Sequence, residues 1–380
     1  MDPKLFYLDS LFEYKLAQPE PKLDSALLRR NRCLEQMFLP ISRPEDFVLV
    51  QELPSETLFG HWKESGLELG TPILTPATLT ECILVEWGNL HRLEDHELIE
   101  DADLYQAARL LNSKVFQWEL RSKHSPLNCK VVSSEEHLAS ELESGFYPSV
   151  IKSEFGLAGR NQIIVKNAND GWKLSQIPKR LFGFPVLLEE WVGESRVFDF
   201  STLWDVKDSK FQYITSTVMM IDPEGQFRGI RILPGEIPYS DLFLPLTHSL
   251  TRDTEPLIPS YTGPCSIDGF VFKRNGLEIQ PVSEFNFRYS IGRILWEVRK
   301  KRKAFEKVSG IFILPFPKLG NPNEWDWIQR LNETGEGMCI FLTPVRDFKN
   351  KPYQNSVLYY ETTESQEETF LANIWETWNI

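Results

Sequence analysis

Three polar side chains stand two residues apart near the end of an apolar stretch. Glu284, Asn286 and Arg288 lie within Leu277–Arg293, which reads LEIQPVSEFNFRYSIGR. An extended strand has a side-chain period of two, so all three side chains would project from one face. A carboxylate, an amide oxygen and a guanidinium aimed at one point suit a hard cation and a phosphate group. Asp268, on the preceding apolar run, would add a second hard ligand.

A lysine followed by a glycine-bearing loop forms a second candidate anion site. Lys152 ends the apolar segment PSVIK, and the loop Ser153–Gln162 contains Gly156 and Gly159. Glycines let backbone N–H groups approach a phosphate closely. The same loop is also typical of an ordinary hairpin tip. Neither GxxxxGK[ST] nor GxGxxG occurs, so the usual nucleotide fingerprints are absent from the sequence.

Two further groups could bind parts of a substrate. The segment Glu189–Val192 ends an apolar strand and could present backbone groups and a carboxylate to an adenine ring, with Glu194 beside the ribose. Arg196, Arg228 and Arg231 lie on strand-like runs and could hold a substrate carboxylate. An ordinary strand end and surface ion pairs would explain the same residues.

The elements that must position these residues begin with a small α/β unit. Short apolar runs at Phe47–Gln51, Thr71–Leu74 and Cys82–Trp87 alternate with a helical stretch at Glu56–Gly66, a pattern that predicts a parallel sheet. Apolar residues recur with a helical period across Asp101–Leu120.

The second half of the chain reads as a hairpin followed by antiparallel sheet. Tyr147–Val165 predicts two strands around the glycine-bearing loop, and Arg196–Arg231 alternates strands with turns. Ile267–Phe272 and Leu277–Asn286 predict two more strands. An amphipathic helix is expected at Ile291–Phe305. Its basic run RKKRK could bind an anion or RNA, but cations also favour the last turn of a helix.

The order of these motifs resembles the ATP-grasp superfamily. The resemblance rests on Lys114, Lys152, the FGLAGRNQ loop, LLEEWV, SIDGFVF and SEFNFR, which together span roughly residues 110–300. It implies a mixed α+β and α/β fold with ATP held between two lobes. The implied parts are a pre-grasp α/β domain (1–110), a lid subdomain (111–190), a larger antiparallel-sheet catalytic lobe with the metal site (191–310) and a C-terminal extension (311–380).

The resemblance also implies a role for each candidate residue. Lys114 and Lys152 would contact the α and β phosphates, and Gly156, Gly159, Arg160 and Asn161 would cover the triphosphate. Adenine would be held by Glu189 and the segment Glu190, Trp191 and Val192, and ribose by Glu194. Two Mg²⁺ ions would be bound by Asp268, Glu284 and Asn286. Arg288 would meet the transferred phosphate or a substrate carboxylate, with Arg196, Arg228 and Arg231 as further substrate contacts.

The implied activity is ligation: ATP would activate a small carboxylic acid as an acyl phosphate, which an amine then attacks. The alternatives are a phosphotransferase and a catalytically silent nucleotide-binding or scaffold protein.

The net charge of −13 argues against non-specific binding to nucleic acid or to an anionic membrane. Five scattered cysteines without a CxxC pair, no secretory signal and no long uncharged apolar window predict a cytoplasmic protein. The sequence leaves the oligomeric state open.

Overall fold

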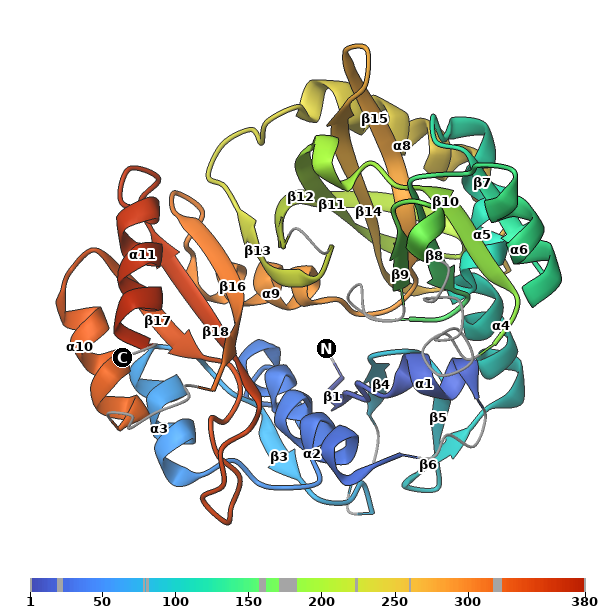
Figure 1. The fold of residues 1–380 in the computed structure, drawn as a ribbon. Coiled ribbons are helices and arrows are strands. Elements are labelled where there is room, and N and C mark those ends of the chain that lie inside the picture. Colours follow the sequence, from blue (N-terminus) through green and yellow to red (C-terminus); the bar gives the residue numbers. More distant parts are fainter. Residues whose placement is uncertain are drawn as a thin grey trace.

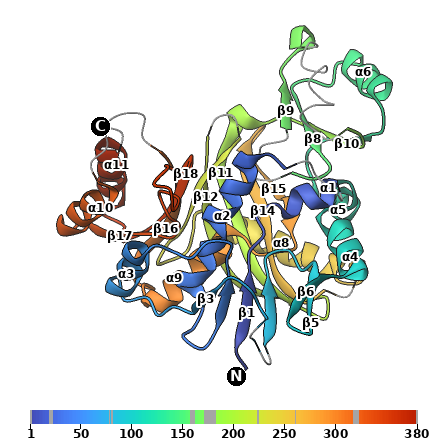
Figure 2. The same ribbon diagram turned by 90° about the horizontal axis from the view of Figure 1, so that it is seen from below.

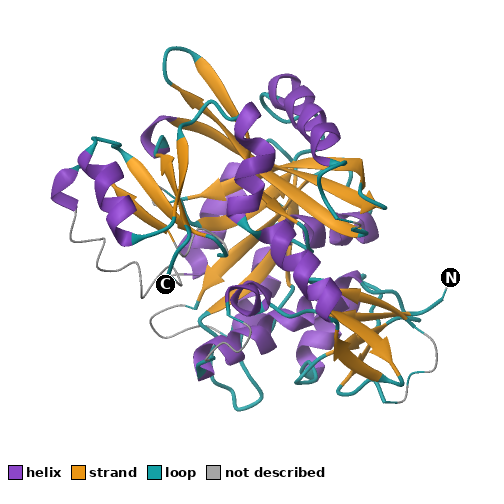
Figure 3. Cartoon of the chain, turned by 90° about the vertical axis from the view of Figure 1, so that its right-hand side faces the viewer, coloured by secondary structure: helices purple, strands orange, loops and turns teal. Residues whose placement is uncertain are grey.

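The structure is a computed structural model. It describes residues 2–18, 23–77, 79, 82–156, 162–170, 183–222, 225–259, 261–316 and 323–378. In these residues the chain forms three principal sheets with helices against the strands of each part (Figures 1 and 3). None of the helices in these ranges is long and apolar enough to cross a membrane.

The N-terminal part contains the parallel sheet that the sequence predicts. Its strand order is β3-β2-β1-β4, and every pair is parallel. The strands are β1 (Lys4–Tyr7), β2 (Phe47–Leu49), β3 (Thr71–Ile73) and β4 (Ile83–Glu86). The helices are α1 (Phe12–Ala17), α2 (Ser25–Leu34), the 3₁₀ helix η1 (Glu35–Ile41) and α3 (Glu56–Glu64). A hairpin of β5 (His91–Glu94) and β6 (Glu97–Glu100) follows.

The expected helix across Asp101–Leu120 is in fact two helices. They are α4 (Ala102–Asn112) and α5 (Lys114–Arg121), followed by the 3₁₀ turn η2 (Ser122–His124). Ser113 lies between them in extended geometry, and its hydroxyl accepts a hydrogen bond from the N–H of Phe116 at 3.3 Å. A capping serine can start a new helix even where the apolar period of the sequence continues. Its hydroxyl binds N–H groups of the new first turn, which carbonyls of the preceding turn would otherwise bind.

The part of the chain expected to form the lid subdomain, called the lid below, has its own sheet and its own core. The sheet has the order β7-β10-β8-β9. Its elements are β7 (Cys129–Val132), α6 (Glu135–Glu143), β8 (Ser149–Ser153), β9 (Gln162–Val165) and β10 (Val186–Glu190). Buried residues such as Leu138, Ile151 and Leu188 form a cluster separate from those of the rest of the chain. The lid projects from the body of the molecule (Figure 2).

The largest sheet has eight antiparallel strands in the order β15-β14-β11-β12-β13-β16-β18-β17. The strands are β11 (Arg196–Lys207), β12 (Lys210–Ile221), β13 (Phe227–Ile232), β14 (Gly263–Lys273), β15 (Leu277–Asn286), β16 (Val308–Pro315), β17 (Gly337–Phe341) and β18 (Asn355–Thr362). The helices of this part are η4 (Gly193–Ser195), α8 (Ser240–Thr254), α9 (Ile291–Arg302), α10 (Glu324–Glu333) and α11 (Glu367–Trp378). A domain boundary at residue 310 would therefore cut strand β16.

The N-terminal and C-terminal ends of the chain share one hydrophobic core. Leu8, Trp62, Leu295 and Phe341 belong to the same buried cluster. The indole N–H of Trp62 also donates to the backbone carbonyl of Phe341 at 2.6 Å. The N-terminal part and the large sheet therefore form one continuous body, and the lid has a separate core.

Candidate active site

The cavity between the lid and the large sheet collects most of the predicted residues. It encloses about 210 Å³. Its lining includes Lys114, Lys152, Gly156, Glu189, Glu190, Trp191, Val192, Arg196, Asp268, Glu284, Asn286 and Arg288. Side chains from two lobes and from the α4–α5 segment therefore face one space. The predicted loop residues Gly159, Arg160 and Asn161 lie outside the described residues.

The break at Ser113 places Lys114 at the start of α5. The Ser113 hydroxyl donates to Glu154 Oε1 at 2.6 Å, and the Lys114 N–H donates to the carbonyl of Glu154 at 3.1 Å. These bonds tie the start of α5 to the end of β8. The Lys114 ammonium then lies 2.7 Å from Glu284 Oε1 and donates to the Gly156 carbonyl at 3.2 Å. Lys114 thereby joins the lid loop to the acidic floor.

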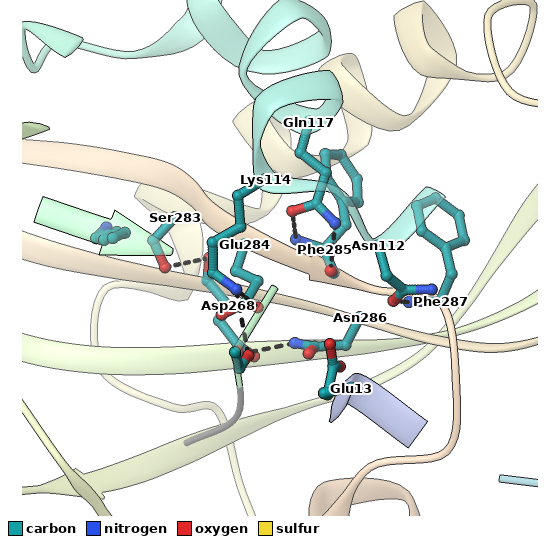
Figure 4. A network of polar contacts seen from close by, with 12 residues as sticks. Glu13, Asn112, Lys114, Gln117, Asp268, Ser283, Glu284, Phe285, Asn286 and Phe287 are labelled. Atoms are coloured by element: carbon teal, nitrogen blue, oxygen red, sulfur yellow. Dashed lines mark hydrogen bonds and ion pairs between the residues drawn. The ribbon is translucent and has the colours of Figure 1, made fainter. Parts of the chain in front are cut away.

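Two buried amides on the α4–α5 segment hold the edge strand β15 in place. Gln117 donates to the carbonyl of Phe285 at 2.7 Å and accepts from its N–H at 3.0 Å (Figure 4). Asn112 accepts from the N–H of Phe287 at 3.1 Å. A backbone without a neighbouring strand needs such partners when it is buried. With both phenylalanines packed inward, Glu284 is left on the cavity face, as the strand period predicts.

Two carboxylates face each other on the floor. Asp268 and Glu284 are direct cross-strand partners of β14 and β15, next to a bulge after Asp268. Burial and the charge of Glu284 raise the pKa of Asp268 to about 6, although hydrogen bonds from Ser201 and Asn286 and the charge of Arg288 oppose the shift. An enclosed pair of like charges is stabilised by an added cation. Oxygen ligands of this type suit Mg²⁺.

Asn286 sits between this acidic pair and Arg288. Its amide nitrogen donates to Asp268 Oδ2 at 3.0 Å (Figure 4). Its oxygen accepts from Arg288 at 2.7 Å. The oxygen is thus turned away from the carboxylates, and its predicted role as a metal ligand requires the amide to reorient. In the described part of the chain, no three Asp, Glu, His or Cys side chains gather as a metal cluster. The donor set that fits a hard cation is therefore Asp268 with Glu284.

The lid end of the cavity has the opposite charge balance. Glu189 is almost fully buried between Lys152, at 2.6 Å, and Arg121, at 2.7 Å. Burial alone would raise its pKa, but the two cations lower the pKa of Glu189 to about 2. Both carboxylate oxygens are engaged. Glu189 therefore holds Lys152 towards the cavity, and a contact with an adenine amino group would require it to give up an ion pair.

The hinge segment after β10 forms the wall of the cavity. The Trp191 ring lies over Gly193, where an added Cβ would be 2.2 Å from a ring carbon, so only glycine fits. The Glu190 carboxylate points instead to Arg274, at 2.7 Å. Glu194 does not line the cavity; its side chain is 88% exposed and lies 3.3 Å from Lys166.

The three arginines proposed as substrate contacts separate in the structure. Arg196 lines the cavity, pairs with Asp199 and lies 4.1 Å over the ring of Phe270. Arg228 and Arg231 instead line a different hollow. Arg228 pairs with Asp222 and Arg231 with Glu367 of α11. Arg228 and Arg231 therefore fit the alternative expectation, in which arginines on strands form ion pairs.

Sequence reasoning missed four residues of the site: Glu13, Asn112, Gln117 and Arg121. Asn112 and Gln117 carried a signal, because they are polar residues inside a predicted amphipathic helix. Arg121 and Glu13 bind partners 68 and 275 positions away in the chain. Nothing in the local pattern points to such contacts.

Comparisons with known proteins agree with this architecture. A scan against protein-family models finds no match. The chain is 27% identical over 294 residues to a butirosin acyl-carrier protein–L-glutamate ligase of Niallia circulans, covering 72% of this chain and 68% of that protein.

Solved structures show the likeness of fold. The N5-carboxyaminoimidazole synthetase of Staphylococcus aureus, complexed with ADP, has a TM-score of 0.55 at 11% identity and covers 98% of this chain and 96% of that one. The L-amino acid ligase of Bacillus licheniformis has a TM-score of 0.50 at 12% identity and covers 72% of each chain. We therefore identify the fold of this chain as the ATP-grasp fold, which confirms the fold that the resemblance of its motifs implies.

Proposed function

We propose that this protein is an ATP-dependent ligase that joins a carboxylic acid to an amine. The observation that carries the proposal is the charge layout of one cavity. A lysine held by the lid faces two carboxylates and an arginine on the floor, with Lys114 between them. The similarity to a glutamate ligase supports the same reaction class.

The reaction would proceed in two steps. An oxygen of the substrate carboxylate attacks the γ-phosphorus of ATP, and ADP leaves as the acyl phosphate forms. The amine nitrogen then attacks the acyl carbon, phosphate leaves and the nitrogen loses a proton. No protein nucleophile is needed, so the work of the protein is positioning and charge neutralisation.

The residues divide this work by location. Lys152 from the lid side, and Lys114 from between the lid loop and the floor, would bind phosphate oxygens. The hinge Trp191–Gly193 would border the adenine. Arg288 would bind the transferred phosphoryl group or the acid. Mg²⁺ held by Asp268 and Glu284 would neutralise phosphate charge; we propose two ions, because two facing carboxylates can share them.

The finer proposal concerns the substrates. The relative in Niallia circulans acts on L-glutamate and an acyl-carrier protein. We propose an amino acid as the source of the carboxylate. The nucleophile would be a small amine, with a carrier-bound amine or thiol as the second candidate that this likeness favours.

The test measures ADP release from the purified protein with ATP, Mg²⁺ and single amino acids, with and without hydroxylamine. Hydroxylamine traps an acyl phosphate as a hydroxamate, so we expect a hydroxamate and an equal amount of ADP with the correct acid. A phosphorylated product that accumulates without any amine would indicate a phosphotransferase. ATP binding without turnover on any acid would indicate a catalytically silent protein.

A further inference from the structure

The N-terminal domain contributes one buried carboxylate directly behind the floor of the cavity. Glu13 lies on α1, and its side chain is 6% exposed. Its Oε1 accepts from Nε of Arg288 at 2.9 Å. In Figure 4 it lies beside Asn286, on the side away from Lys114. A buried charge of this kind is maintained only when it is paired, so the contact fixes where α1 meets the segment that follows β15.

The guanidinium of Arg288 has a partner at each of its three nitrogens. Besides Glu13 at Nε, one terminal nitrogen donates to the Tyr289 carbonyl at 3.0 Å and the other to Asn286 Oδ1 at 2.7 Å. The guanidinium carbon also lies 5.8 Å from the centre of the Trp87 ring. A planar fork held at three points has one orientation. That orientation sets which N–H groups remain for a ligand in the cavity.

The contacts continue to the acidic pair. Asn286, which accepts from Arg288, also donates from its amide nitrogen to Asp268 Oδ2 at 3.0 Å. A chain of three hydrogen bonds thus runs from α1 of the N-terminal domain to the carboxylates that would hold a cation. Loss of a residue that hydrogen-bonds to and orients a metal ligand typically lowers metal affinity or activity by ten- to a hundredfold.

We propose that Glu13 is a positioning residue for Arg288, and that the N-terminal domain thereby controls the phosphoryl-transfer end of the cavity. This inference rests on the proposed function, in which Arg288 binds the transferred group. Glu13 itself does not line the cavity. It acts through Arg288 by holding the guanidinium plane and balancing its charge.

The experiment is a double-variant cycle of Glu13→Gln and Arg288→Met, with kcat and KM for ATP measured in the ADP-release assay. Glutamine keeps the shape and one acceptor but removes the charge. We expect kcat to fall by roughly ten- to a hundredfold, with KM for ATP within about twofold of wild type because the ATP contacts from the lid are untouched. In the Arg288→Met background, Glu13→Gln should change kcat by no more than about twofold, since the group it positions is gone.

A matched control separates positioning from local packing. Asp9 is a buried acid just before α1; it accepts from the Leu11 N–H at 2.9 Å and pairs with Lys15 at 2.7 Å, away from Arg288. Asp9→Asn should affect unfolding as Glu13→Gln does, but leave kcat close to wild type. Glu13→Asp keeps the charge but withdraws it by one methylene, and we expect it to lose kcat as well. It also serves as the test variant if Glu13→Gln does not fold.

The outcomes distinguish this inference from the function on which it rests. Wild-type turnover in Arg288→Met would overturn the proposed role of Arg288. A defective Arg288→Met with a fully active Glu13→Gln would overturn only the positioning role. Independent, multiplying losses in the double variant would likewise overturn it, because Glu13 would then act by another route.

Discussion

The two ends of the cavity are built from the same residue types in opposite proportions. At the lid end, two cations, Lys152 and Arg121, surround one carboxylate, Glu189. On the floor, Asp268 and Glu284 face each other, and Glu13 behind Arg288 makes three carboxylates beside the two cations Lys114 and Arg288. The pKa values follow this difference: that of Glu189 is lowered to about 2, whereas that of Asp268 is raised to about 6.

Under the proposed function, this difference would let one cavity receive both parts of a metal-bound triphosphate. The ammonium of Lys152 would attract phosphate oxygens at the lid end, and the facing carboxylates of the floor would attract a cation. The two ends of the cavity also differ in how they are packed against the rest of the molecule. The lid has a separate small core, whereas the floor strand β15 is braced by Asn112 and Gln117. The proposed phosphate-binding end is therefore on the part that has its own separate core.

Removal of a floor carboxylate should have the largest effect. We expect Glu284→Gln to lower kcat on the order of a thousandfold or more, because a cation ligand and the partner of Lys114 are both lost. ATP should still bind weakly through the lid. The ADP-release assay and ATP titration measure the two effects separately.

The control for this variant lies on the same strand. Glu278 of β15 is near the surface and lies 3.5 Å from Arg274. Glu278→Gln makes the same chemical change outside the cavity and should keep nearly full activity. Full activity in Glu284→Gln would refute the role of the floor as a cation site.

The lid end should respond in ATP affinity. Lys152→Ala removes the cation that faces the cavity, while Arg121 still neutralises Glu189 and preserves the fold. A charge-assisted hydrogen bond contributes about 1.5–3 kcal/mol, so KM for ATP should rise by roughly ten- to a hundredfold. Lys130→Ala, which breaks an exposed pair with Glu141 in the same lobe, is the control. Unchanged ATP dependence in Lys152→Ala would exclude Lys152 from the site.

The contrast in pKa predicts a stability effect confined to the floor. In metal-free protein the raised pKa of Asp268 means that the folded state binds a proton more tightly than the unfolded state between about pH 4 and pH 6. The free energy of unfolding should therefore fall as pH rises through this window, by about 3 kcal/mol. Asp268→Asn should abolish this part of the pH dependence and stabilise the protein at pH 7.5 in EDTA.

Urea unfolding at several pH values, with and without Mg²⁺, measures this effect. Mg²⁺ should stabilise the wild type at pH 7.5 by binding only the folded state, and should stabilise Asp268→Asn much less. A variant less stable than wild type in EDTA at pH 7.5 would show that the two floor carboxylates do not repel each other.

The part of this site that could be predicted is the part set by local geometry. The two-residue period of β15 places Glu284 and Asn286 on one face regardless of what surrounds the strand. Register is also largely local, because β14 and β15 are joined by a short turn, and this brings Asp268 opposite Glu284. The parallel N-terminal sheet follows in the same way from alternating strands and helices.

What could not be predicted depends on contacts between distant segments. The partners of Glu189 and Arg288 come from α5 and α1, and no local pattern reports them. The contacts of the basic run at the end of α9 could not be predicted either, because they are also made to other segments. Lys301 donates to the carbonyl of Glu68 at 2.7 Å, and Arg299 donates to that of Phe305 at 2.7 Å. These two cations bind backbone carbonyls of neighbouring segments, a use that neither a solvated helix face nor an RNA-binding run describes.

The smallest effect should come from an arginine that the sequence placed at the substrate and the structure places elsewhere. Arg228 is 57% exposed, lies 2.6 Å from Asp222, and lines a hollow distinct from the cavity. Exposed pairs of this kind contribute about 0–1 kcal/mol. Arg228→Ala should therefore change KM for the acid by less than about twofold, whereas Arg196→Ala, inside the cavity, should change it more. Equal losses in both variants would mean that the substrate extends beyond the cavity across β13, and that the contrast between its two ends describes only the nucleotide.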